Sequence, residues 1–243
     1  MGPEMNRAVP DLADVLAARR RIGPYLRPTP LYRYPALDAL TGARVQVKHE
    51  NHQPVGAFKV RGGVNLVSQL TEDERRRGVI AASTGNHGQS VAFAADLFGV
   101  RAVICMPEQA NPVKVESMRA LGAEVVFHGA DFDEAREHCE KQAGSLVEDT
   151  TSTFAEGLAT RTAFELPQQI MRDRLDDFVL VTEEALRDAT RLMISKTRNL
   201  VEPAGAAPLA AVLTAPGRFQ GRNVALICSG GNISPDQLVA LLA

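Results

Sequence analysis

The chain has 243 residues, of which 45% are hydrophobic and 23% are charged, and its formal net charge is −2. This length is enough for one large domain or two small ones with a buried core. The charge balance argues against a nucleic-acid-binding surface, which would need a basic stripe. No apolar run approaches the roughly 20 residues that cross a bilayer, and the first residues show no pattern of a secretory signal.

The three cysteines, Cys105, Cys139 and Cys228, are scattered without the paired spacing of a metal or redox site. An odd, dispersed set of this kind is typical of reduced thiols in a cytoplasmic protein. Cys105 and Cys228 lie in apolar runs of strand length, where a free thiol packs as a small hydrophobic side chain. The five histidines show no metal-ligand spacing, so we expect no metal site.

Short apolar runs alternate along the chain with amphipathic stretches, a pattern typical of βα units around a mostly parallel sheet. The sequence therefore predicts the α/β class. The expected strands are Val45–Lys48, Val79–Ala82, Ala102–Met106, Glu124–Phe127, Phe178–Val181 and Asn223–Cys228.

Capping signals and apolar residues at helical spacing predict the helices between these strands. The expected helices are a short one after the capping box at Thr71–Glu74, then Asn86–Phe98, Pro112–Leu121, Asp131–Ala143 and Glu156–Arg174. Pro167 should kink or divide the last of these, because proline lacks the N–H that a helix interior uses.

The stretch from Val79 to Gly144 is an unbroken series of βα units, so we expect residues 79–144 to form a smaller lobe. Residues 1–78 and 145–243 would form a larger, discontinuous lobe, with a cleft between the two. Ligands of open parallel sheets bind beyond the carboxyl ends of the strands. The loops 83–88 and 229–232 both follow predicted strands, which places them where a ligand is expected.

Lys59 lies between Phe58 and Arg61, directly ahead of a predicted helix. A lysine becomes a good nucleophile when desolvation or a neighbouring cation lowers its pKa, and these two neighbours offer both influences. The alternative is a solvated lysine at the start of a helix.

The loop Ser83-Thr84-Gly85-Asn86-His87-Gly88 opens a helix, so its amides are directed toward an anion such as a carboxylate. Asn86 either donates a hydrogen bond to a phenolic oxygen or simply caps the helix. His87 titrates in a range suited to proton transfer, although a hydrogen bond to backbone explains a loop histidine equally well.

Two later segments are further candidates. In Ser229-Gly230-Gly231-Asn232, two residues without side chains let the backbone approach a ligand closely, and a bare turn is the alternative. Glu202 stands ahead of Pro203-Ala204-Gly205, where it either faces the site or is a surface glutamate.

Four segments together resemble the motifs of fold-type II pyridoxal-phosphate (PLP) enzymes, most closely the threonine/serine dehydratase group that includes serine racemase. These segments are Asn51–Gly62, Ser83–Gln89, Glu202–Ala206 and Ser229–Asn232, within a similarity that runs from about Leu31 to the end. The resemblance implies a tryptophan synthase β-like fold with two open parallel-sheet lobes, PLP as cofactor and a small amino-acid substrate. A cytoplasmic homodimer without nucleic-acid or membrane partners is also implied.

By position, the resemblance implies that Lys59 holds the cofactor covalently and removes the α-proton of the substrate. Phe58 would pack on the cofactor ring, Asn86 would contact its hydroxyl, and Ser229 would hydrogen-bond its pyridine nitrogen. Glu202 and Gly230 complete the implied cofactor-binding set. The implied substrate-binding loop consists of Ser83, Thr84, Gly85, Asn86 and His87.

The implied activity is β-elimination, which converts L-threonine, L-serine or a related 3-hydroxy amino acid to a 2-oxo acid and ammonia. A neutral hydroxyl at Ser229 leaves the pyridine nitrogen largely unprotonated, which makes the ring a weaker electron sink and favours elimination over transamination. Thr84 carries a hydroxyl where serine racemase has one and many dehydratases have alanine. Racemase activity, with Thr84 as a catalytic hydroxyl, is therefore a second expectation.

One part of the family pattern is missing. The tetraglycine loop that binds the cofactor phosphate has no counterpart, because the chain passes from Leu146–Thr150 directly to Thr153–Thr160. Relatives have several tens of residues there, including two central strands. We expect an incomplete larger lobe with exposed sheet edges and without the usual phosphate anchor, so that only Gly62-Gly63 and Gly230-Gly231 remain as glycine pairs. Either the molecule contains residues absent from this sequence, or it is a shortened enzyme or a non-catalytic scaffold.

Overall fold

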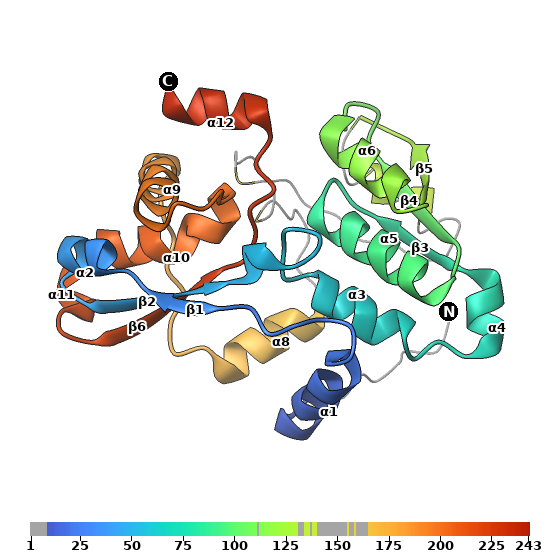
Figure 1. Cartoon of the computed structure of the whole chain (residues 1–243), viewed down its shortest axis with the longest axis horizontal. Helices are drawn as coiled ribbons and strands as arrows, with labels where there is room; N and C mark the ends of the chain where they lie inside the picture. Colours follow the sequence, from blue (N-terminus) through green and yellow to red (C-terminus); the bar gives the residue numbers. More distant parts are fainter. Residues whose placement is uncertain are drawn as a thin grey trace.

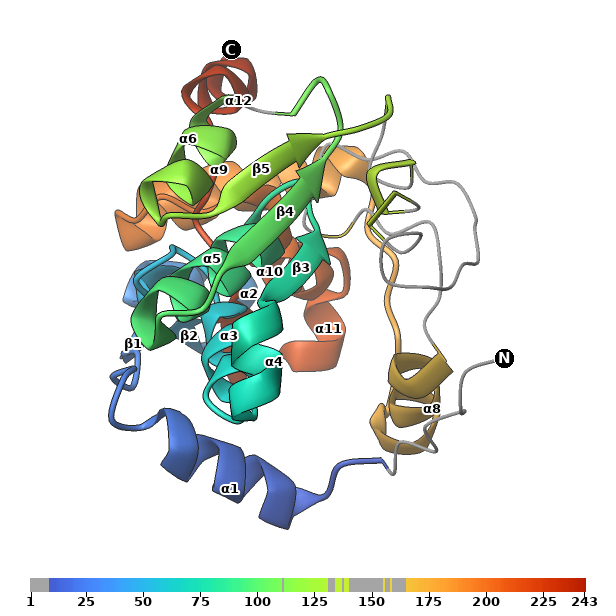
Figure 2. The same cartoon turned by 90° about the vertical axis from the view of Figure 1, so that its right-hand side faces the viewer.

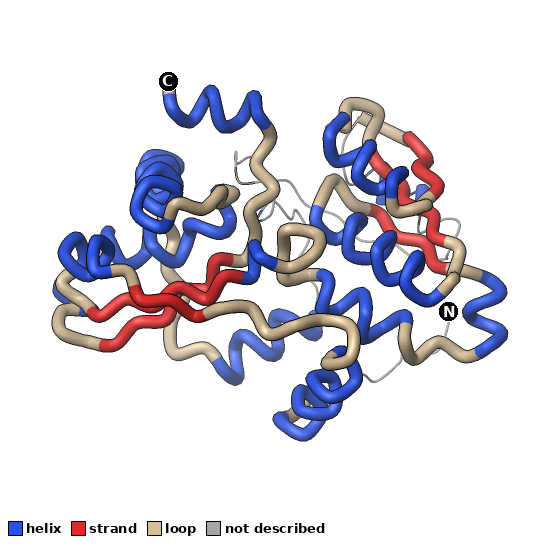
Figure 3. Tube along the Cα trace, in the orientation of Figure 1, coloured by secondary structure: helices blue, strands red, loops and turns tan. Residues whose placement is uncertain are grey.

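Two three-stranded sheets organise the chain, at opposite sides of the molecule with α3 (Val60–Val67) between them (Figure 1). The computed structural model describes residues 9–110, 112–130, 134–136, 138–139, 155, 158 and 165–243. Figure 3 shows the strands of the two sheets as separate groups with helices around them. The α/β class is confirmed.

The larger sheet has the order β1-β2-β6. Its strands are β1 (Leu31–Arg33), β2 (Arg44–His49) and β6 (Asn223–Cys228). β1 runs antiparallel to β2, whereas β2 and β6 are parallel with Val47 opposite Leu226. Val45, Val47 and Leu226 point into a core shared with α2 (Pro35–Thr41), α9 (Glu183–Thr197) and α10 (Pro203–Thr214).

The opposite face of this sheet is open to solvent. Gln46 and Ala225 are exposed there, and Ile227 is 48% exposed. Within the described ranges, β6 has a neighbouring strand on one side only, and α8 (Glu165–Arg174) buries none of its residues. An incomplete larger lobe was expected from the short interior, and the open face agrees with it.

The smaller sheet is fully parallel, in the order β3-β4-β5 (Figure 2). Its strands are β3 (Val79–Ala82), β4 (Ala102–Met106) and β5 (Glu124–Phe127). The helices α5 (Asn86–Phe98) and α6 (Pro112–Ala120) pack with them. Val60, Val64 and Val67 of α3 lie in the same apolar core, as does Ile22 at the end of α1 (Leu12–Ile22). The division of the lobes at residue 78 stays a prediction.

The local sequence explains most element ends. In α4 (Glu72–Arg77), the Thr71 hydroxyl accepts from the amide of Glu74 while the Glu74 carboxylate accepts from the amide of Thr71, which is the predicted capping box. α5 ends at Gly99, whose left-handed φ of 64° suits glycine. The short elements η1 (Glu50–His52), α11 (Pro216–Phe219) and α12 (Pro235–Leu242) complete the described structure.

Three expectations need correction or remain outside the structure. Phe178–Val181 was expected as a strand but has no regular structure, and Leu180 is 85% exposed, because no neighbouring strand pairs with this run within the described ranges. Of the helix expected over Glu156–Arg174, the structure describes Leu158 and the residues from Glu165 onward; Pro167 falls in the first turn of α8 (Glu165–Arg174), where its missing N–H costs little. Most of the helix expected over Asp131–Ala143 lies outside the described residues.

Candidate active site

Two motifs that are far apart in the sequence are hydrogen-bonded to one another. The amide of Phe58 donates to the carbonyl of Ser229 at 2.9 Å, and the amide of Gly231 donates to the carbonyl of Gly56 at 2.9 Å. These bonds flank an antiparallel bridge between Ala57 and Gly230. The segment that leads into Lys59 is therefore held against the Ser229–Asn232 loop, as the sequence predicted for parts of one site.

Lys59 is the residue immediately before α3 and has helical backbone angles. Its carbonyl accepts a hydrogen bond from the Ser90 hydroxyl of α5 at 2.6 Å, which ties the lysine to the smaller sheet's layer. Burial lowers the pKa of the Lys59 amine, and the negative charge of Glu202 only partly offsets this. Lys59 is half-buried, and its lowered pKa favours a nucleophilic amine over the alternative of a fully solvated lysine.

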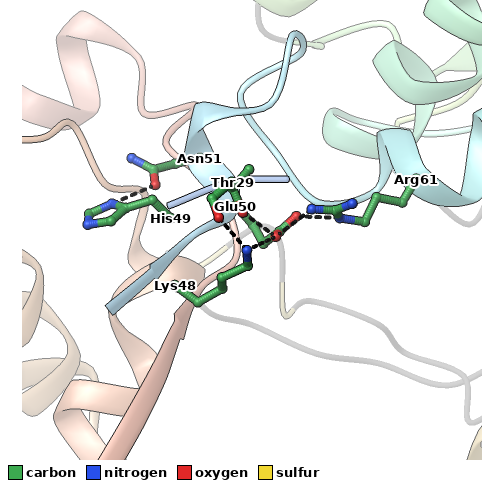
Figure 4. A network of polar contacts seen from close by, with 6 residues as sticks. All are labelled: Thr29, Lys48, His49, Glu50, Asn51 and Arg61. Atoms are coloured by element: carbon green, nitrogen blue, oxygen red, sulfur yellow. Dashed lines mark hydrogen bonds and ion pairs between the residues drawn. The ribbon is translucent and has the colours of Figure 1, made fainter. Parts of the chain in front are cut away.

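An ion pair anchors the turn that follows Lys59 (Figure 4). The Arg61 guanidinium donates from Nε to Glu50 Oε2 at 2.8 Å and from Nη2 to Glu50 Oε1 at 2.9 Å. Glu50 is only 5% exposed and also accepts from the Thr29 hydroxyl at 2.7 Å. Because Glu50 follows β2 and Arg61 belongs to α3, this pair fixes the lysine-bearing helix to the larger sheet.

The Ser83–Gly88 loop follows β3 and leads into α5. Its buried Ser83 hydroxyl accepts from the amides of Gly85 at 3.1 Å and Gly88 at 2.8 Å, so this side chain shapes the loop from within. The role of Ser83 in gripping a substrate stays a prediction. Thr84, next in the loop, is half-buried.

Asn86 lies in a chain of side-chain hydrogen bonds that joins three loops. Its Nδ2 donates to Glu202 Oε1 at 2.7 Å, and its Oδ1 accepts from Asn232 Nδ2 at 2.8 Å. The helix N-cap position is taken by Gly85 instead, so capping does not explain Asn86. The Asn86 side chain therefore lies between Glu202, which precedes α10, and Asn232, in the loop after β6.

Glu202 is 8% exposed and is the residue before α10, so it is not a surface glutamate. A Cβ added to Gly230 would lie 2.2 Å from Glu202 Oε1, which means that glycine is required at 230 to make room for the carboxylate. Burial and the charge of Glu202 raise the pKa of the Cys228 thiol to about 12. That thiol is buried and inert, as a packing role predicts.

The remaining candidates are placed around this centre. The Phe58 side chain is 45% exposed and Ser229 is half-buried. The His87 side chain is exposed, yet the surrounding protein displaces enough water to lower its pKa, and the positive charge of Lys59 lowers it further. His87 is therefore biased toward its neutral form.

Sequence reasoning missed three contributors. Glu50, Ser90 and Asn232 had no assigned role, although Ser90 and Asn232 bond to the predicted site residues Lys59 and Asn86, and Glu50 bonds to Arg61, two residues after Lys59. Ser90 lies four residues after Asn86 on α5, so helical spacing could have placed it on the same side. The partner of Glu50 could not have been found, because the pairing depends on how η1 turns after β2.

The model of the pyridoxal-phosphate-dependent enzyme family matches residues 22–146 and 139–230 of this chain. The chain belongs to this family. An L-threonine ammonia-lyase of Thermotoga maritima is 28% identical over 308 aligned positions, which cover 93% of this chain and 77% of the relative. An L-threo-3-hydroxyaspartate ammonia-lyase of a Pseudomonas species is also 28% identical, covering 94% of this chain and 97% of the relative.

Solved structures give the same picture. A threonine deaminase from T.th. is 30% identical with a TM-score of 0.83, covering 93% of this chain and 99% of that one. Maize serine racemase superposes with a TM-score of 0.86 at 23% identity, over 97% of each chain, and shares the fold. The prediction of a fold-type II PLP enzyme is confirmed.

The alignments also confirm the shortened interior of this PLP-family chain. The alignment with the Thermotoga protein has 308 positions, whereas 93% of 243 residues is about 226, so about 80 aligned positions have no residue here. No helix in the described ranges has the length and apolar character to span a membrane.

The described residues fit the pyridine-ring half of PLP better than its phosphate. The half-buried Lys59 amine has a lowered pKa, the Asn86 amide bonds to Glu202, and the backbone of Ser229 bonds to Phe58 beside Lys59, so the groups that a pyridine ring needs come from adjoining loops. In contrast, the amide of Gly231 already donates to Gly56, and those of Gly62 and Gly63 donate to Lys59. Neither glycine pair therefore offers two free amides for a phosphate.

Proposed function

We propose that this chain is a PLP-dependent ammonia-lyase that converts L-threonine, L-serine or a related 3-hydroxy amino acid to a 2-oxo acid and ammonia. The observation that carries the proposal is the placement of half-buried Lys59 at the point where the Gly56–Phe58 backbone is hydrogen-bonded to the Ser229–Gly231 loop, together with the lowered pKa of its amine. The names of the relatives, among them L-threonine and L-threo-3-hydroxyaspartate ammonia-lyases, support this reaction class.

PLP, when bound, supplies an electron sink for the bonding electrons left at the α-carbon. Lys59 would hold the cofactor and would take up the α-proton on its Nζ, a role that the lowered pKa of its amine supports. Ser90 and Arg61 keep the lysine's backbone and its helix in place while the side chain works.

Asn86 and Ser229 orient the ring in this proposal. The Asn86 amide nitrogen would donate to the phenolic oxygen, and the Ser229 hydroxyl would bond to the pyridine nitrogen. A neutral hydroxyl at Ser229 would leave that nitrogen largely unprotonated, and such a partner would favour β-elimination over transamination.

The substrate carboxylate is assigned to the first turn of α5. The first amides of a helix have no partner within the helix, and they favour an anion. The Ser83 hydroxyl already takes the amides of Gly85 and Gly88, so we assign the amides of Asn86 and His87 to the carboxylate. A neutral His87 side chain carries no positive charge that would attract the substrate carboxylate away from these amides.

Racemisation is the second candidate, and the hydroxyl of Thr84 in the substrate loop favours it. A proton donor on the face opposite Lys59 would return a proton to the α-carbon with inverted configuration. Enantiopure L-serine should then yield D-serine in addition to ammonia. If ammonia forms and D-serine does not, Thr84 has no such role.

The proposal is tested by the covalent attachment itself. The purified protein should be yellow, and borohydride reduction followed by peptide mapping should find a pyridoxyl group on Lys59. Lys59→Ala should abolish the colour, whereas Lys196→Ala, which removes an exposed lysine of α9, should not. A protein that stays colourless after addition of PLP would support the alternative of a non-catalytic scaffold.

We also propose that the protein is a homodimer in the cytoplasm. The three buried cysteines are free thiols, which suits a reducing compartment. Sedimentation of the purified protein would give a mass of twice 26.2 kDa for the dimer.

A further inference from the structure

Asn232 connects the lysine loop to Asn86 through a single nitrogen atom. Its Nδ2 donates to the carbonyl of Val55 at 2.8 Å and to Asn86 Oδ1 at 2.8 Å. From these contacts we infer that Asn232 is a positioning residue, which determines that Asn86 presents its amide nitrogen, and not its oxygen, to Glu202.

The direction of this hydrogen-bond chain follows from its first member. A backbone carbonyl only accepts, so the Asn232 atom that contacts Val55 must be the nitrogen of the amide. The same nitrogen contacts Asn86, whose facing atom must then be its oxygen, because two amide nitrogens would meet donor to donor. The other arm of Asn86 is consequently an N–H group, 2.7 Å from Glu202 Oε1.

The position of the Asn232 side chain is itself constrained. Gly56 has a left-handed φ of 67°, and a Cβ there would lie 2.4 Å from Asn232 Oδ1. Glycine at 56 thus leaves the room that the asparagine occupies. The amide of Gly231 also donates to the carbonyl of Gly56, so backbone and side chain hold the same two loops together.

The consequence reaches the lysine through Glu202. An N–H donor stabilises the carboxylate as an anion, and that anion raises the pKa of Lys59 against the effect of burial. If Asn86 were reversed, its oxygen would face the carboxylate, and Glu202 would need a proton to bond to it. The link to catalysis rests on the proposed function, whereas the direction of the hydrogen bonds does not.

The test is a mutant cycle in the purified chain, measured by thermal unfolding without added cofactor. Asn232→Asp keeps the shape of the side chain but replaces the donor with an acceptor, so Asn86 must reverse to bond to it. We expect Tm to fall by about 4 °C, the scale of 1–2 kcal/mol in a chain of this size. Glu202→Gln should then restore the part of the loss that arises at Asn86, because a glutamine can turn its own N–H toward the reversed Asn86, whereas the lost bond to the carbonyl of Val55 is not recovered.

Two controls separate this relay, the chain of hydrogen bonds from Asn232 through Asn86 to Glu202, from general repulsion between carboxylates. Asn51→Asp adds the same charge near Gly231 but acts on the carbonyl of Leu200, so Glu202→Gln should not restore its Tm. In an Asn86→Ala background, the restoration of Asn232→Asp by Glu202→Gln should disappear, because the connecting side chain is gone.

The inference would be overturned if the losses in Tm of Asn232→Asp and Glu202→Gln simply added in the double variant. It would also be overturned if Glu202→Gln restored the Tm of Asn51→Asp to the same extent. Neither result depends on whether the chain is an ammonia-lyase. A colourless protein that passes the cycle would refute the proposed function and leave the relay standing.

Discussion

The Arg61 guanidinium and the Glu50 carboxylate form a two-point pair, with Nε to Oε2 at 2.8 Å and Nη2 to Oε1 at 2.9 Å. The pair spans the helix that begins after Lys59 and the turn that follows β2. The pair therefore holds Lys59 in its position relative to the larger sheet, and substitutions at Glu50 test this role.

Glu50→Gln should destabilise the protein by about 1–3 kcal/mol, because it leaves a hydrogen-bonded arginine without its charged partner. Urea unfolding measures this change. Glu72→Gln is the matched control, since Glu72 contributes to an ion pair on α4 with its side chain 79% exposed, and it should change stability by less than about 0.5 kcal/mol. Equal effects of the two substitutions would show that the pair anchors nothing.

Acid should weaken this anchor. Burial disfavours the charge of Glu50, but hydrogen bonds from Arg61 and Thr29 outweigh it and hold the pKa of Glu50 below its usual value. The stabilisation is therefore complete above the ordinary glutamate pKa of about 4.3 and is lost as the pH falls through the lower, folded-state value. Unfolding free energies between pH 6 and about pH 3 should fall less steeply in Glu50→Gln than in the parent protein.

Glu202→Gln should lower the pKa of Lys59 further, because it removes the negative charge that raises it. Labelling of the cofactor-free protein with an acylating reagent, followed by peptide mapping, gives the pH at which half of Lys59 reacts. In the parent protein this midpoint should lie below the ordinary lysine value of about 10.4. It should move lower in Glu202→Gln, and an unchanged midpoint would show that the charge of Glu202 does not act on Lys59.

Gly230→Ala should displace the Glu202 carboxylate, since the added Cβ would lie 2.2 Å from Oε1 and 3.2 Å from Asn86 Nδ2. We expect a loss of about 1–3 kcal/mol in stability and weaker uptake of PLP, followed by the growth of visible absorbance. Gly62→Ala is the control within the same site region. Its Cβ meets nothing within 4 Å in α3, so it should stabilise the helix by about 0.5–1 kcal/mol.

The sequence predicted the strands of the smaller sheet to the residue, because each is a short apolar run between turn signals in a βα series. Phe178–Val181 has the same apolar character and is not a strand. A strand needs a neighbour to pair with, and an apolar run does not reveal whether one exists. β1 was not predicted, since three residues that pair antiparallel with β2 give no periodic pattern.

The site was predicted at the level of loops but not of hydrogen bonds. Lys59, Asn86, Glu202 and Ser229 were recognised from motifs, and the structure brings their loops together. The motifs did not reveal that Ser83 bonds to its own loop or that Asn232 reaches Val55, 177 positions away. Such partners depend on distances between loops, which local sequence does not encode.

The uncovered side of the larger sheet has a practical consequence for handling this protein. Ile227 is nearly half exposed, and β6 is paired along one side only in the described part of the chain. Its other edge has unpaired backbone groups that can bond to an extended peptide of another molecule. Light scattering should therefore grow with protein concentration and with warming. Ile227→Lys should suppress this increase in scattering, since a charge at this position opposes the association of one molecule with the next.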